Sequence, residues 1–321
     1  MENICAVLVI IILLPYVFTV LFQGNHIQSG YSQTDGIQEW KQTENSRYII
    51  REDADHEQIT IEEYVAGAVA ASIPITYERE TLKAQAVIVR THIMLMMDGR
   101  ESAAEKELSL SYMDVGEMQD VWGYQEFTQN YEKLTEAVKA TEGQVLTYAD
   151  ELIYPPFHAV SAGKTRNGNE IAGRQVYPYL LSVDSSMDLE SEDFLKIEYY
   201  ERSELISKLR TYDETIVLNK TAADEINLNY ECENHYVKTV QFKDSQVSMT
   251  GEQFRDLFDL NSTCFSVEDY EGAFRIVTKG LGHGIGFSEY GANQMARQGS
   301  SYETLLQYYY SGVTLKSMNN L

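Results

Sequence analysis

The sequence is short of positive charge. Its 321 residues include 25 lysines and arginines against 49 aspartates and glutamates, which gives a formal net charge of −24. Nucleic-acid phosphates and anionic lipid surfaces attract proteins with the opposite balance, so the composition argues against a binder of either. It fits a protein that lies outside the cytoplasmic membrane and meets a neutral or zwitterionic partner.

Cysteine is scarce too. The three cysteines, Cys5, Cys232 and Cys264, are too few for a disulfide framework, and they show no zinc-binding spacing. Cys5 lies in an apolar N-terminal run, whereas Cys232 and Cys264 could pair in an oxidising compartment. The sequence therefore predicts no metal site and no cofactor, and it contains no internal repeat.

Residues 4–22 contain no charged residue, and this run is continuously apolar except for Thr19 and Pro15. It is long enough to cross a bilayer. A cleaved signal peptide is the alternative, but the preceding residues carry no basic charge and the run ends without a small-residue cleavage site. We therefore predict an uncleaved transmembrane anchor over residues 1–23 and a polar, flexible linker over residues 24–46.

The remaining chain has an ordinary globular composition, with 44% hydrophobic and 23% charged residues. It is long enough to bury a substantial core, and its helical and alternating patterns mix along the sequence. The fold class expected is α+β. Helices are predicted at 60–74, 80–97, 131–141, 202–210 and 251–258, strands at 144–148, 152–154, 236–242 and 246–249, and a loop-rich stretch at 99–126.

The most distinctive stretch is 279–296, which reads KGLGHGIGFSEYGANQMA. Its first four glycines alternate with larger residues, a pattern typical of backbone that approaches a neighbour closely or needs positive φ. Ser288 can then cap a helix, so the loop and the helix N-terminus together could hold a polar or anionic ligand. His283 within the loop could equally be a hydrogen-bonded turn residue. The spacing does not match a dinucleotide-binding fingerprint.

Three segments together resemble a known family. They are GLGHGIGFSEYGANQMARQG followed by LLQYYYSGVTL, YVAGAVAASIPITYERETLKAQAVIVRTHI from Tyr64, and FHAVSAGKTRN from Phe157. They are similar to motifs of the stage II sporulation protein D / LytB amidase-enhancer family. The SAGKT piece is not a phosphate-binding Walker loop, because His158 stands where a glycine is required. The differences from the family pattern include Leu281, Glu289, Tyr308 and Ser311.

The resemblance covers residues 48–321 and implies one mixed catalytic-type domain at 47–321, with 185–267 as an inserted α+β subdomain. It also implies a lytic transglycosylase chemistry on peptidoglycan glycan strands, in which a single glutamate serves as acid and base. That glutamate belongs to an EMP triplet, and here Ser72 occupies its place. The substrate-binding residues that the resemblance implies are Lys83, Gln85, Arg90, His158, Ser161, His283 and Ser288.

Lys83, Arg90, His158 and His283 are expected to converge with Ser72 on one groove, although Lys83 and Arg90 could instead mark a solvated helix face. Three interpretations remain open. The protein is a glycan-binding scaffold or amidase activator that has lost its acid, an active transglycosylase whose acid has moved, or a structural anchor that binds no glycan. Glu289 is the best candidate for a moved acid, ahead of Glu78 and Glu80.

The resemblance further implies a single-pass protein of the cell membrane whose folded domain faces the cell wall. Peptidoglycan glycan strands are the expected ligand. A cell-wall amidase and other membrane proteins of engulfment are the expected companions, and no nucleic acid is expected. A role in vegetative wall turnover is the alternative that the amidase-enhancer branch would imply.

Overall fold

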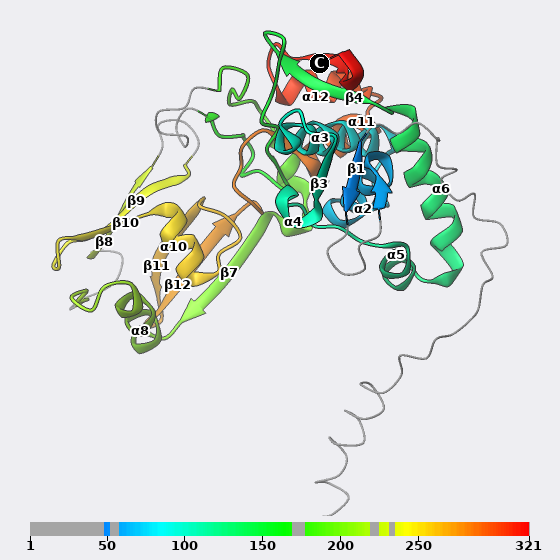
Figure 1. Cartoon of the computed structure of the whole chain (residues 1–321). Coiled ribbons are helices and arrows are strands. Elements are labelled where there is room, and N and C mark those ends of the chain that lie inside the picture. The colour runs from blue at the N-terminus through cyan, green and yellow to red at the C-terminus, as the bar shows by residue number, and fades with distance from the viewer. Residues whose placement is uncertain (1–47, 52–57, 169–176, 219–224, 231–234, 321) are drawn as a thin grey trace, which may run out of the picture. The chain divides into compact units, whose positions relative to one another are not determined.

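The computed structural model describes residues 48–51, 58–168, 177–218, 225–230 and 235–320, which belong to one unit of the chain, Gln42–Leu321 (Figure 1). The helices are α2 (Ile61–Ser72), α3 (Arg79–Met97), α4 (Glu105–Leu108), α5 (Val115–Trp122), α6 (Tyr124–Ala140), α8 (Arg202–Tyr212), α10 (Gly251–Phe258), α11 (Glu289–Arg297) and α12 (Tyr302–Tyr309). Short 3-10 helices are η1 (Ser186–Glu190), η2 (Glu192–Phe194) and η3 (Met318–Asn320).

The strands are short and form five small sheets. They are β1 (Ile49–Arg51), β2 (Gln58–Thr60), β3 (Ser102–Ala104), β4 (Gln144–Tyr148), β5 (Glu151–Leu152), β6 (Phe157–His158), β7 (Leu195–Tyr200), β8 (Ile226–Tyr230), β9 (Val237–Phe242), β10 (Val247–Thr250), β11 (Phe265–Tyr270), β12 (Ala273–Lys279), β13 (Phe287–Ser288) and β14 (Thr314–Ser317). The sheet orders are β2-β1-β3, β10-β9-β8, β11-β12-β7, β13-β6 and β14-β4-β5. The mixture of helix and strand confirms the α+β fold class.

Helix α2 begins with a capping box, which the spacing of Thr60 and Glu63 in the sequence predicts. The Thr60 side chain accepts a hydrogen bond from the Glu63 N–H at 3.3 Å, and the Glu63 carboxylate accepts one from the Thr60 N–H at 2.6 Å. The helix ends at Ser72, because Ile73 takes an extended conformation before Pro74. Helix α3 follows after a short turn and packs against α2, α6 and α12.

The stretch 99–126, which we expected to be mostly loop, is more ordered than that. It contains β3, α4 and α5, and α5 opens with a second capping box between Asp114 and Glu117. Helix α6 begins at Tyr124, seven residues earlier than predicted, directly after Gly123. These elements were missed because they are short, and their packing against α3 and α6, rather than their own periodicity, stabilises them.

The strands predicted at 144–148 and 152–154 form the hairpin that their spacing indicates, with the turn one residue earlier than the Asp150-Glu151 turn that the sequence predicts. Strands β4 and β5 pair antiparallel across Ala149 and Asp150, which both have positive φ, at 49° and 71°. A two-residue turn of that kind matches the twist of paired strands. The C-terminal strand β14 completes this sheet by pairing with β4 in an antiparallel register from Thr314 to Ser317.

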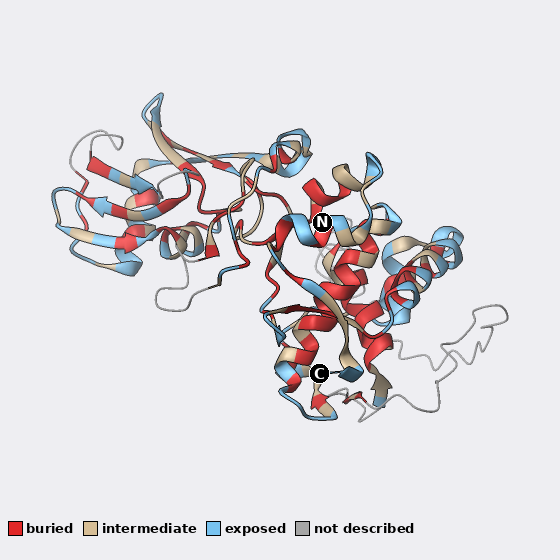
Figure 2. Cartoon of the chain, turned by 90° about the horizontal axis from the view of Figure 1, so that it is seen from above, coloured by how far each residue is buried: buried red, intermediate tan, exposed pale blue. Residues whose placement is uncertain are grey.

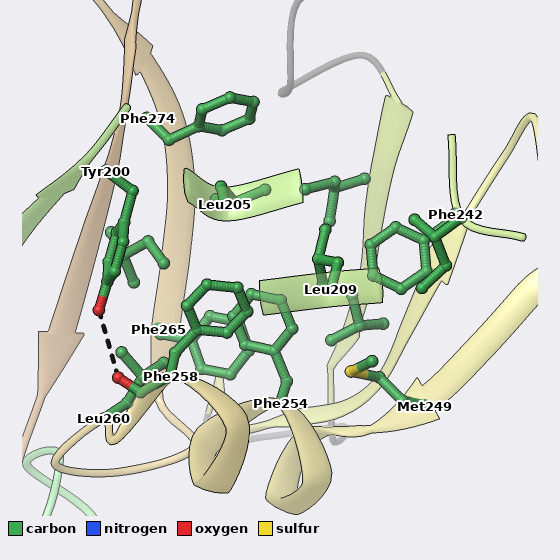
Figure 3. Packing of buried hydrophobic residues seen from close by; sticks show 14 of the residues in the cluster. Tyr200, Leu205, Leu209, Phe242, Met249, Phe254, Phe258, Leu260, Phe265 and Phe274 are labelled. Atoms are coloured by element: carbon green, nitrogen blue, oxygen red, sulfur yellow. Dashed lines mark hydrogen bonds between the residues drawn. The ribbon is translucent and has the colours of Figure 1, made fainter. Parts of the chain in front are cut away.

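Two hydrophobic clusters lie in the described part of the chain, apart from further buried side chains of α2, α3 and α6. One joins α3 to α11, α12 and strand β13 around Phe287, Leu305 and Tyr309. The other joins α8 and α10 to strands β7 to β12, and Figure 3 shows its stacked rings of Phe254, Phe258 and Phe265. In Figure 2 the buried residues line the inner sides of these elements, and the exposed residues lie on their outer sides.

The second cluster bears on the proposed subdomain boundaries. The helices and strands predicted between 202 and 258 are present as α8, β9, β10 and α10. The cluster extends past residue 267, however, because Phe274 and Ile276 of β12 are part of it. The inserted subdomain at 185–267 stays a prediction, as do the anchor and linker, since residues 1–47 lie outside the described part of the chain. Among the described residues no helix is both long enough and apolar enough to cross a membrane.

Candidate functional site

The glycine-rich loop is held in the backbone conformation that its composition predicts. Gly280, Gly282, Gly284 and Gly286 all have positive φ, between 69° and 111°. The loop also lies directly on the segment before His158: a Cβ atom on Gly286 would come within 2.2 Å of the Pro156 carbonyl oxygen. Side chains larger than hydrogen are therefore excluded at this loop both by conformation and by contact.

This loop brings two histidines together. The parallel pairing of β6 with β13 sets His158 beside Ser288, and the rings of His158 and His283 lie 5.6 Å apart between centroids. His158 Nδ1 donates to the Ile285 carbonyl oxygen at 3.0 Å, and His283 Nδ1 accepts from the Ile285 N–H at 3.0 Å. The two rings are thus fixed in complementary tautomers by one residue.

Both histidines are uncharged near neutral pH. Burial and, to a smaller extent, the neighbouring His283 lower the pKa of His158 to about 3. Burial also lowers the pKa of His283 to about 4, with Arg166 and Arg255 acting in the same direction. The Nε2 atom of His158 is buried and has no hydrogen-bond partner among the described residues. These rings can orient a polar group but cannot donate a proton as imidazolium ions.

A buried carboxylate that the sequence analysis missed organises the two serines. Asp188 of η1 accepts hydrogen bonds from the Ser161 N–H at 3.0 Å and from the Ser288 hydroxyl at 2.8 Å. Burial raises the pKa of Asp188, while hydrogen bonds from Ser161, Ser288 and Ser185 oppose that change. Ser288 occupies the N-cap position of α11, but its hydroxyl is bonded to Asp188 and not to the helix. The predicted capping bond is therefore wrong.

The sequence held little signal for Asp188, because it is one of many acidic residues between 184 and 204. Only the folded chain distinguishes it: its side chain is fully buried, whereas the neighbouring Asp184, Glu190 and Asp193 are exposed. Ser161 and Ser288 hydrogen-bond this carboxylate, and their binding of substrate stays a prediction.

Glu289, the first residue of α11, is a second buried carboxyl group at this place. It is only 4% exposed, and burial raises its pKa to about 8. Its carboxyl group makes no hydrogen bond or ion pair with any residue that the structure describes. Tyr77, from the turn after α2, lies nearby: burial and then the charge of Glu289 raise the pKa of its phenol to about 12.

The turn between α2 and α3 is joined to α11 by hydrogen bonds as well. The side-chain oxygen of Asn293 accepts from the Glu78 N–H at 2.8 Å, and the Thr81 hydroxyl lies 3.4 Å from the same oxygen. The N-terminal turn of α11, with Glu289, therefore lies against the chain that immediately follows Ser72 and Pro74.

Ser72 itself lies at the edge of a hollow. Its hydroxyl donates to the Val69 carbonyl oxygen at 3.1 Å and accepts from Gln85 Nε2 at 3.2 Å. The hollow has a volume of about 370 Å³ and is lined by residues 70–76 together with Val121 and Trp122. We call it the Ser72 hollow. None of these lining residues is ionisable, and within the described chain no hydrogen bond joins Ser72 to the histidine pair.

Lys83 and Arg90 lie on the same helix, α3, but in different surroundings. Lys83 is partly exposed, forms an ion pair with Glu80 at 2.6 Å and lies over the ring of Tyr302. Arg90 is fully buried and binds Glu62 through two hydrogen bonds, at 2.9 and 2.6 Å. The expectation that Arg90 lines a groove is therefore wrong, and so is its alternative of a solvated face.

The other acidic candidates are engaged elsewhere. Glu80 bonds Lys83 through one oxygen and accepts the Tyr302 N–H through the other at 2.9 Å. Glu78 is exposed and lies 3.8 Å from Arg297. Cys264 has a free, buried thiol, and Cys232 lies outside the described residues. No group of three or more potential metal-binding side chains occurs in the part of the chain that the structure describes.

Comparison with known proteins identifies the family of this chain. The family model described as "Stage II sporulation protein" matches residues 52–148. The chain is 30% identical to "Stage II sporulation protein D" of Bacillus amyloliquefaciens, over 97% of this chain and 94% of that protein. The chain belongs to the stage II sporulation protein D family.

Other relatives agree. The family's member from Bacillus subtilis (strain 168), also named "Stage II sporulation protein D", is 31% identical over 81% of this chain and 75% of its own length. A protein named "Amidase enhancer" from the same organism is 25% identical over 78% of this chain and 40% of its own length. The matched residues 52–148 include Ser72, Gln85 and the Glu62–Arg90 pair.

Within the family domain, the buried Glu62–Arg90 pair is expected to be structural. We expect Arg90→Ala to lower the free energy of unfolding by about 3–5 kcal/mol, because it leaves the Glu62 carboxylate buried without its partner. Lys83→Ala, which breaks a partly exposed pair, is the matched control and should cost about 1 kcal/mol or less. Urea unfolding followed by tryptophan fluorescence measures both. An Arg90→Ala protein with unchanged stability but lost glycan binding would contradict this assignment.

Proposed function

We propose that this protein acts in sporulation at the cell wall, where it binds glycan strands of peptidoglycan without cleaving them and supports a cell-wall amidase. The observation that carries the proposal is the surroundings of Ser72. The position where the family motif has its glutamate holds a hydroxyl with both a donor and an acceptor bond, beside a hollow without an ionisable side chain.

The replacement of the family's glutamate by Ser72 argues against cleavage at this position. Lytic cleavage needs a group that protonates the glycosidic oxygen and then, as a base, removes the proton of the sugar C6 hydroxyl. A serine hydroxyl is a poor acid near neutral pH and cannot alternate between these tasks. Loss of a general acid–base group usually lowers the rate by ~10²–10⁴-fold.

The Ser72 hollow suits a sugar ligand. Its volume of about 370 Å³ lies within the range of small-ligand sites. Trp122 offers an aromatic ring to one side, while Ser72 and Thr76 supply hydroxyl groups. Aromatic rings pack well against the apolar faces of sugars, and hydroxyl groups can hydrogen-bond their edges. The hollow therefore supports binding without supplying a catalyst.

The amidase connection and the location are parts of the same proposal. The similarity to the protein named "Amidase enhancer" supports a role beside an amidase. The apolar run at 4–22 supports a membrane anchor with the family domain on the wall side. Other membrane proteins of engulfment are the expected companions during sporulation.

The deciding experiment incubates the full-length chain, in detergent micelles, with glycan strands from which an amidase has removed the stem peptides. We expect the strands to sediment with the protein and mass spectrometry to find no 1,6-anhydro sugar ends. Trp122→Ala should weaken the binding without unfolding the protein, because Trp122 is partly exposed. If no glycan binds at all, the protein is a structural anchor and the proposal fails.

A second function is favoured by one specific observation, the buried carboxyl group of Glu289, which has no partner among the residues that the structure describes. A carboxyl group with a pKa of about 8 is protonated at neutral pH and can act as a general acid. On this alternative the protein is an active transglycosylase with a moved acid. The same experiment separates the two functions: anhydro ends from the wild type that vanish in Glu289→Gln, with binding retained, would establish the alternative.

A further inference from the structure

Strand β7 lies at the edge of a three-stranded sheet. The order of that sheet is β11-β12-β7, and β7 pairs antiparallel with β12 along its whole length, from Leu195 opposite Lys279 to Tyr200 opposite Phe274 (Figure 1). No other described strand pairs with β7. Its second row of backbone N–H and C=O groups is therefore available to a further strand.

One face of β7 carries three exposed, largely apolar side chains, beside Arg275 of β12, which is paired with Glu268 of β11. Leu195, Ile197 and Tyr199 alternate along the strand and are 50%, 44% and 55% exposed. Tyr270 of β11 lies on the same face, 5.6 Å from the Tyr199 ring, and is 41% exposed. Tyr200 points the other way into the cluster of Figure 3. An exposed edge strand with an apolar face is uncommon unless it has a partner.

The charges around β7 indicate which partner fits. Glu192 and Asp193 precede the strand and Glu201 follows it, and all three are exposed. Within the strand, Glu198 Oε1 lies 3.3 Å from Lys196 Nζ, so these two charges offset each other and the exposed carboxylates are the ones that flank the strand. A second copy of this chain would bring the same carboxylates to the same edge, and each copy carries a net charge of −24. Like charges oppose that pairing, whereas a basic segment is attracted.

We propose that β7 is a docking strand for an extended, basic segment of another protein, which adds to the edge of the β11-β12-β7 sheet. Backbone hydrogen bonds to β7 supply affinity, and alternate side chains supply specificity. The partner's apolar residues pack on Leu195, Ile197 and Tyr199, and its lysines or arginines lie near the carboxylates that flank the strand. This surface shares no residue with the Ser72 hollow, so the proposal does not depend on glycan binding.

The probe is a short synthetic peptide that alternates valine with lysine, labelled for fluorescence anisotropy and titrated with the full-length chain in detergent micelles. Two control peptides are the same sequence with N-methyl groups on alternate residues, which cannot pair as a strand, and a scrambled sequence of equal composition. We expect saturable binding of the first peptide and at least about tenfold weaker binding of both controls.

The matched protein variants are Ile197→Lys and Val115→Lys, which add the same charge at two exposed valine or isoleucine side chains. Only Ile197→Lys should weaken binding, again by about tenfold or more. If the N-methylated and scrambled peptides bind as tightly as the first peptide, the proposal is overturned, because the attraction is then purely ionic. Equal affinity of the Ile197→Lys and Val115→Lys proteins for the first peptide would also overturn it. Self-association that Ile197→Lys abolishes, without peptide binding, would assign the edge to a second copy instead.

Discussion

Replacing Glu289 with glutamine is expected to stabilise the protein at alkaline pH and to change its stability little at pH 4. Burial raises the pKa of this carboxyl group from 4.5 to about 8. Between these two values the unfolded chain releases the proton while the folded chain retains it. The folded state then binds more protons than the unfolded state, so the free energy of unfolding falls as the pH rises from about 4.5 to about 8.

The size of the effect follows from the same pKa difference. Each unit of pKa is worth about 1.4 kcal/mol, which gives a cost of up to about 5 kcal/mol above pH 8. Glutamine has a similar shape and no charge, so Glu289→Gln removes this cost. His158 and His283 lower the free energy of unfolding at acid pH, because there the unfolded chain binds protons on these rings that the folded chain does not. They are present in both proteins and cancel in the difference.

Urea unfolding of wild type and Glu289→Gln at several pH values between 4 and 9 measures the effect. Glu142→Gln, at an exposed position, is the matched control and should leave the pH dependence unchanged. Parallel curves for the wild type and Glu289→Gln across this range would show that Glu289 is not held neutral, and the alternative function that depends on its proton would lose its physical basis.

Introducing glutamate at position 72 is expected to create the glycan-cleaving activity that the proposed function denies to the wild type. The apolar lining of the Ser72 hollow should raise the pKa of a carboxyl group placed there, as a general acid requires. Gln85 is positioned to hold the new group: its Nε2 already donates to position 72, and its Oε1 is buried without a partner among the described residues. A protonated carboxyl group offers the hydrogen that this oxygen lacks.

We expect Ser72→Glu to release 1,6-anhydro sugar ends ~10²–10⁴-fold faster than wild type, the range that a general acid–base group supplies. Ser72→Gln has nearly the same size but cannot transfer a proton, so it is the matched control. Mass spectrometry of the stripped glycan strands measures both. Equal, background-level release from Ser72→Glu and Ser72→Gln, in proteins that still bind glycan, would mean that the hollow is not the place where the family's acid acts.

Local features were read correctly where the determining contacts lie close in sequence. The capping box of Thr60 and Glu63, the hairpin of β4 and β5, and the positive φ of the loop glycines each depend on a few neighbouring residues. The helix spacing in α3 predicted its extent, but it did not show which polar residues are buried. Arg90 was misjudged for that reason: its partner Glu62 is 28 residues away, on another helix.

The sequence by itself determined the α+β class, the capping box of α2, the glycine loop and the family. These depend on local backbone preferences and on motif residues that can be read directly. Only the tertiary structure decided the roles of the polar side chains. Burial and pairing across the fold made Arg90 structural, bonded Ser161 and Ser288 to Asp188, and left Glu289 neutral, because the cost of burying a charge depends on neighbours that are distant in sequence.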